Sequence, residues 1–168
     1  VCIPFAWVWM LPSQYQDFSR SLLAVIGFVS NIFFWQQSGY FAAAAEEKPL
    51  LHTWSLAVEE QFYLLFPLVL WLVWKYGKRQ TYLWVGLAAL ASLMLSEYAS
   101  RYHVNANFFL LPTRAWELMI GALCALVHHQ TPTQKNNVAA SLGLGFVVVA
   151  LITYNESMRL PSLYSALP

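Results

Sequence analysis

Six apolar segments separated by short polar loops restrict this chain to one class of fold. Most of the proline, asparagine and charged residues lie in the loops. Long apolar runs without charges are typical of membrane helices. We therefore expect an all-α, polytopic transmembrane helix bundle with one partial helix and five full ones, at about residues 1–11, 21–37, 53–74, 81–97, 113–128 and 138–154.

Composition agrees with a lipid environment and excludes several functions. Hydrophobic residues make up 59% of the chain and charged residues only 10%. A formal net charge of +1 leaves no basic surface for nucleic acid, so we exclude a nucleic-acid partner. Cys2 and Cys124 lie in apolar runs without metal-ligand or redox spacing. We interpret both as packing residues and expect no metal site.

The ends and one internal segment affect how the domain is interpreted. Residues 1–11 resemble the end of a helix, and the last residues form a loop. We expect residues 1–168 to be an internal part of a single transmembrane domain, truncated at both ends. Gly27, Ser30 and Asn31 interrupt the 21–37 segment, which is either a crossing or a re-entrant segment.

Loop charge predicts the orientation in the membrane. By the positive-inside rule, we place the basic loops in the cytoplasm: the region with Arg20 before the 21–37 segment, then 75–79 and 129–137. The opposite side then holds 38–52, 98–112 and 155–168.

Two acids, Glu59 and Glu60, lie near the start of the 53–74 segment. On a helix, Ser55, Glu59 and Tyr63 share one face, while Glu60 points about 100° away. An acid within the bilayer costs about 2.5–3.5 kcal/mol and usually belongs to a site. Glu59 and Tyr63 are therefore candidate catalytic residues and Ser55 a substrate-binding one. Alternatively, both acids are interfacial residues favoured by the helix dipole.

Three polar residues near this helix are further candidates. His52 can act as an acid or base beside Glu59, or can simply hydrogen-bond water in the loop. Asn31 and Tyr40 flank the 38–52 loop and are candidate sugar-binding residues, although a structural role fits both.

A second constellation lies at the start of the 113–128 segment. Arg114 and Glu117 are i, i+3 neighbours and can form an ion pair. Gly121 and Ala125 continue that face with small side chains, which permit close helix contact. Both charged residues are candidate substrate-binding residues, and a structural ion pair at the helix end is the alternative.

The run His-Thr-Trp-Ser-Leu-Ala-Val-Glu-Glu-Gln-Phe-Tyr at 52–63 closely resembles the membrane-bound acyltransferase family 3 pattern. Ser30-Asn31, Gly39-Tyr40-Phe41 and the stretch 114–125 resemble further parts of that family, notably its O-antigen and polysaccharide acetylases. The resemblance implies a multi-pass protein of the bacterial inner membrane. It also implies transfer of an acyl group, usually acetyl from acetyl-CoA, to a hydroxyl of a glycan or lipid-linked oligosaccharide, such as the O-antigen of lipopolysaccharide. Acyl-CoA is then a substrate, and no bound cofactor is expected.

The resemblance also implies separate catalytic and binding roles for individual residues. Family members carry a histidine and a basic residue in a first helix, and an arginine-rich cytoplasmic loop, none of which matches this sequence. We expect that histidine to accept the sugar proton and Glu59 to orient it, with Tyr63, Arg114 and Glu117 shaping the acyl or acceptor channel. The 168 residues by themselves are then expected to be inactive. A proton-coupled glycan or lipid transporter and a structural membrane subunit are the alternatives.

Overall fold

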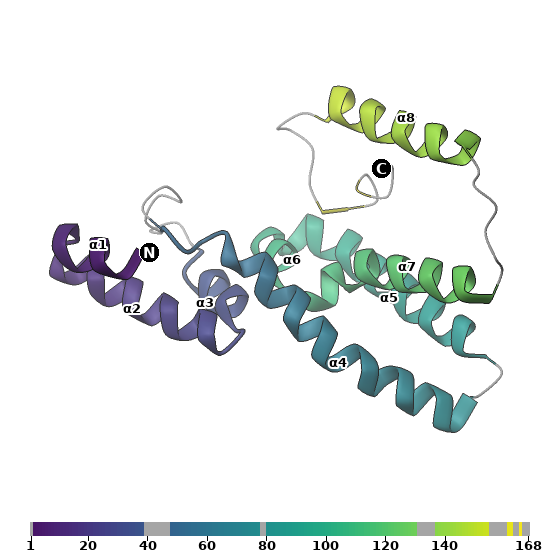
Figure 1. Ribbon diagram of the computed structural model, residues 1–168, viewed down its shortest axis with the longest axis horizontal. Coiled ribbons are helices and arrows are strands. Elements are labelled where there is room, and N and C mark those ends of the chain that lie inside the picture. The colour runs from purple at the N-terminus through teal and green to yellow at the C-terminus, as the bar shows by residue number, and fades with distance from the viewer. Residues whose placement is uncertain are drawn as a thin grey trace. The chain divides into compact units, whose positions relative to one another are not determined.

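The structure, a computed structural model, describes residues 2–38, 48–77, 80–130, 137–154, 161–162 and 165. These residues form helices and contain no strand, so the predicted all-α fold class is confirmed. Along the chain (Figure 1) the helices are α1 (Cys2–Trp9), α2 (Pro12–Ile26), α3 (Ser30–Gln36), α4 (Thr53–Gly77), α5 (Thr81–Tyr102), α6 (Val104–Phe109), α7 (Leu111–Gln130) and α8 (Asn137–Thr153).

Three stretches of the described residues are long and apolar enough to cross a membrane: Thr53–Tyr76, Thr81–Tyr102 and Val104–Leu126. At about 1.5 Å per residue, the continuous helices Thr53–Tyr76 and Thr81–Tyr102 each exceed the roughly 30 Å of a hydrocarbon core. The third stretch is divided between α6 and α7. A shorter apolar helix covers Ala140–Thr153. Together with the many exposed apolar side chains on these helices, this identifies a membrane protein.

The long helices extend further than their apolar runs. We expected α5 to end near residue 97 and a loop to follow over 98–112, and this was wrong. The helix continues to Tyr102, and α6 occupies most of the remainder. Arg101 donates to Glu97 at 2.6 Å, and this i, i+4 ion pair supports the polar last turn, which hydropathy does not detect.

The 21–37 segment is not one helix. Helix α2 starts earlier than predicted, with Pro12 at its first position, where the missing N–H costs nothing. It ends at Ile26, and Phe28 has a left-handed φ of +55°. The N–H groups of Phe28 and Val29 donate to the carbonyls of Val25 (3.1 Å) and Ala24 (2.9 Å), which is the Schellman pattern. Glycine usually occupies the left-handed position, and a side chain there costs about 1–2 kcal/mol.

The chain forms two compact units, which we describe separately. Unit 1 comprises Val1–Pro67 with Phe109–Leu111, and unit 2 comprises Leu68–Phe108 with Pro112–Pro168. In unit 1, buried side chains include Phe34, Ala57, Val58 and Phe62. In unit 2, the buried face of α5 consists mainly of small residues, which allow close helix packing: Val85, Ala89, Ser92, Ser96, Ala99 and Ser100.

Candidate functional site

The first turns of α4 carry the predicted catalytic residues on one open face. Ser55, Glu59 and Tyr63 follow one another at four-residue spacing, and all three are exposed. His52, just before the helix, is exposed too, and its carbonyl accepts a hydrogen bond of 3.2 Å from the Ser55 hydroxyl. Among the described residues, no hydrogen bond or ion pair joins Glu59 to His52. The shared face is as predicted, whereas the catalytic roles stay predictions.

The neighbouring face of the same turns is packed. Ala57, Val58 and Phe62 are 3%, 4% and 6% exposed, and Phe62 stacks on Phe66 with ring centroids 4.6 Å apart. This packing fixes the rotation of α4 within unit 1. Glu59 consequently lies on the side of the helix that a substrate or another segment can reach.

A pair of side-chain amides, the buried Asn31 and the half-buried Gln61, attaches the break between α2 and α3 to α4. Gln61 Nε2 donates to the carbonyl of Phe28 at 2.7 Å and to Asn31 Oδ1 at 2.8 Å. Asn31 Nδ2 donates to the carbonyl of Phe109 at 3.2 Å, with a longer contact of 3.4 Å to Gln61 Oε1. Nearby, the buried Ser30 hydroxyl donates to the carbonyl of Thr53 at 3.0 Å.

These contacts bear on the two predicted sugar-binding residues near the loop. The side chain of Asn31 lies inside unit 1, 1% exposed, with its hydrogen bonds made to the chain itself. Its sugar contact stays a prediction. Tyr40 lies outside the described residues. Sequence reasoning missed Gln61, although an amide beside two acids in an apolar helix was a visible signal.

A hollow of about 470 Å³ lies where the break between α2 and α3 meets α4. Glu60 contributes to it, and Glu59 does not. The other lining residues are mainly apolar, and the complete lining is Gly27, Phe28, Val29, Glu60, Gln61, Tyr63, Leu64 and Leu65. The two adjacent acids therefore face different surroundings, as their predicted angular separation requires.

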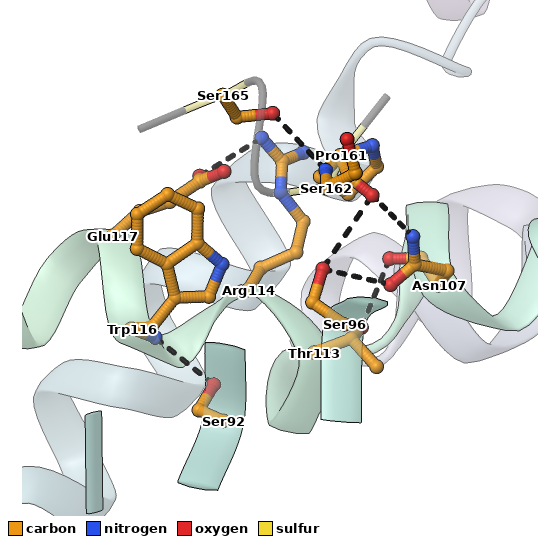
Figure 2. A network of polar contacts seen from close by, with 10 residues as sticks. All are labelled: Ser92, Ser96, Asn107, Thr113, Arg114, Trp116, Glu117, Pro161, Ser162 and Ser165. Carbon is orange, nitrogen blue, oxygen red and sulfur yellow. Dashed lines mark hydrogen bonds and ion pairs between the residues drawn. The ribbon is translucent and has the colours of Figure 1, made fainter. Parts of the chain in front are cut away.

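In unit 2, the predicted pair at the start of α7 does form. Arg114 donates to Glu117 across 3.1 Å, and the two side chains are 25% and 32% exposed (Figure 2). The geometry fits both open interpretations, since a half-buried ion pair can anchor a helix end or hold a charged substrate group. The ion pair is therefore confirmed, and its substrate-binding role stays a prediction.

A serine of α5 is inserted into the first turn of α7. The Ser92 hydroxyl donates to the carbonyl of Pro112 at 2.7 Å. It also accepts from the N–H of Trp116 at 3.0 Å (Figure 2). A regular helix joins these two backbone groups directly, because they are four residues apart. Within the described residues, the buried indole N–H of Trp116 has no hydrogen-bond partner.

A second buried network in unit 2 centres on Asn107 of α6. Asn107 Nδ2 donates to the carbonyl of Pro161 at 2.6 Å, and its Oδ1 accepts from Ser96 at 3.1 Å (Figure 2). Thr113 donates to the Asn107 carbonyl at 2.9 Å. Sequence reasoning missed this network, because 98–112 was interpreted as a loop. In the described part of the chain, no three His, Cys, Asp or Glu side chains form a metal-binding group.

Comparison with known proteins identifies the family. A family model described as an acyltransferase domain matches residues 3–163. The chain is 32% identical to an uncharacterized protein of Haemophilus influenzae, over 92% of this chain and 69% of that protein. It is 36% identical to the O-acetyltransferase OatA of Staphylococcus aureus, over 69% of this chain and 20% of OatA. No solved structure matches. This chain, in nearly its whole length, belongs to the acyltransferase family 3.

Proposed function

We propose that this chain is part of a bacterial inner-membrane enzyme that transfers an acetyl group from acetyl-CoA to a hydroxyl of a cell-surface glycan. Family membership and the similarity to a protein named O-acetyltransferase support acyl transfer to oxygen. The observation that carries the site assignment is the open face of α4, where an acid, a histidine, a hydroxyl and a phenol are all exposed beside a packed face.

The reaction requires a general base. The glycan oxygen attacks the thioester carbonyl carbon and loses its proton to the base, and the C–S bond then breaks. The thiolate of CoA takes up the proton, so that free thiol and acetyl ester are the products. An imidazole suits this task, because it gains and loses a proton near neutral pH.

Glu59 has the role of a positioning carboxylate in this scheme. An imidazole that accepts the sugar proton becomes cationic, and a nearby carboxylate stabilises that charge strongly where water is scarce. The imidazole belongs to His52 or to a residue outside this chain. Ser55 and Tyr63, on the same face, supply hydroxyl groups that can hydrogen-bond the acceptor. Arg114 and Glu117 are proposed to bind substrate in unit 2.

The test is Glu59→Gln in the full-length protein, with Glu60→Gln as the matched control. Glutamine keeps the size and most hydrogen bonds of glutamate but removes its charge. We expect Glu59→Gln to insert normally yet to abolish glycan acetylation, and Glu60→Gln to retain most of it. Mass spectrometry of glycan from cells carrying each variant measures the outcome. Normal acetylation with Glu59→Gln would refute the site assignment.

A further inference from the structure

The hollow in unit 1 lies between two walls. One wall is the break between α2 and α3, and the other is the stretch of α4 from Glu60 to Leu65. Phe28 adopts its left-handed conformation in the first wall and lines the hollow. Strained backbone of this kind persists where the surrounding structure holds it, and it concentrates at binding sites. Here the carbonyl of Phe28 is held by Gln61.

The two polar side chains Gln61 and Glu60 of the hollow differ in their hydrogen-bond partners. Gln61 uses its amide N–H groups on Phe28 and Asn31. Glu60 is half-buried, and its carboxylate has no hydrogen bond or ion pair within the part of the chain that the structure describes. A carboxylate in apolar surroundings normally has a countercharge or hydrogen-bond donors. The hollow therefore offers a free anionic acceptor.

Most of the remaining surface of the hollow is hydrocarbon, and Tyr63 adds a phenol. Val29, Leu64 and Leu65 line it, and Leu64 is 67% exposed. These residues belong to, or lie beside, helices of a membrane protein, so lipid chains are the apolar groups available to cover them. A ligand that matches both features has a hydrocarbon chain and a cationic head group with N–H donors.

We propose that the hollow binds a membrane lipid with a primary ammonium head group. The ammonium donates hydrogen bonds to Glu60, and one hydrocarbon chain lies against Val29, Leu64 and Leu65. Charge complementarity selects this occupant, because an anionic or purely hydroxylated head group supplies no countercharge. The proposal does not require the acyl-transfer reaction and concerns a different acid from Glu59, although Tyr63, which we assign to the acceptor site, also lines the hollow.

Lipid binding to the full-length, delipidated protein in detergent tests this proposal by native mass spectrometry. The probes are phosphatidylethanolamine, phosphatidylcholine and phosphatidylglycerol with identical acyl chains. Phosphatidylcholine keeps the positive charge but has no N–H donor, and phosphatidylglycerol has no cation. We expect about tenfold tighter binding of phosphatidylethanolamine than of phosphatidylcholine, the size of one charge-assisted hydrogen bond.

Three variants locate the effect. Glu60→Gln should reduce the preference to about twofold or less, because a neutral amide attracts the ammonium weakly. Leu64→Trp should weaken binding of all three lipids by filling the hollow. Leu72→Trp, at an exposed leucine of the same helix outside the hollow, is the matched control and should change nothing.

Two outcomes would overturn the proposal. One is equal binding of phosphatidylethanolamine and phosphatidylcholine by the unmodified protein, which is the result expected if another protein segment covers the hollow. The other is a preference that survives Glu60→Gln. Because that variant changes neither volume nor packing, it remains informative even if Leu64→Trp fails to fold.

Discussion

Replacing Gln61 with leucine should release the break between α2 and α3 from α4. Leucine has a similar volume but removes the donor to the Phe28 carbonyl (2.7 Å) and the donor to Asn31 Oδ1 (2.8 Å). The third contact, at 3.4 Å, is too long to contribute much. Side-chain hydrogen bonds in membrane proteins average about 0.6 kcal/mol and reach about 1.7. Two of them give an expected loss of about 1–3 kcal/mol in the free energy of unfolding.

A double-mutant cycle with Asn31→Ala isolates the amide pair. The bond from Gln61 to Phe28 is present in both the unmodified protein and the Asn31→Ala variant, so it cancels. The coupling energy between Asn31 and Gln61 should be about 0.6–1.7 kcal/mol. Reversible unfolding of the full-length protein by SDS in mixed micelles, followed by circular dichroism, measures it.

The matched control is Gln80→Leu. Gln80 is exposed immediately before α5, so this substitution should change the free energy of unfolding by less than about 0.5 kcal/mol. Additive effects of Asn31→Ala and Gln61→Leu would show that the amides do not interact and would refute the described geometry. The geometry would also be refuted if Gln61→Leu lowered the free energy of unfolding no more than Gln80→Leu does.

Three further predictions follow from other parts of the chain. His52→Gln should retain most glycan acetylation if the base lies outside this chain, and its complete loss in the same mass-spectrometric assay would assign His52 as the base. Ser92→Ala should cost at most about 1 kcal/mol of unfolding free energy, because the first turn of α7 can close its own hydrogen bond; a loss above about 3 kcal/mol in SDS unfolding would show that it cannot. In a cysteine-free background, Gly77→Cys should be protected from an impermeant thiol reagent in intact cells and Asn105→Cys labelled, as the loop charges predict; the reverse pattern would contradict the predicted orientation.

The long helices were predictable because their signal is local. An apolar run predicts a membrane helix from composition, and the i, i+4 spacing of Ser55, Glu59 and Tyr63 correctly placed them on one face. The Arg114 and Glu117 pair was predictable for the same reason, since three-residue spacing on a helix brings the side chains together.

Features that depend on distant partners were not predictable. Gly27 was recognised as an interruption, but the left-handed residue is Phe28, which is held by Gln61 from another helix. Likewise, Asn107 hydrogen-bonds the carbonyl of Pro161, 54 residues away, and no local pattern indicates such a contact. The difference between Glu59 and Glu60 was predicted as an angle, whereas the hollow beside Glu60 depends on how the α2–α3 break packs.

The hydroxyl of Ser92 has a consequence for the order of assembly. Membrane helices form as separate units and pack afterwards. Before packing, the first turn of α7 has only its own backbone groups, so the N–H of Trp116 bonds the carbonyl of Pro112 directly. Once α5 arrives, Ser92 lies between these groups. Helix α7 thus reaches its final shape only after docking, and Arg114, which lies within the turn between Pro112 and Trp116, acquires its final direction at the same step.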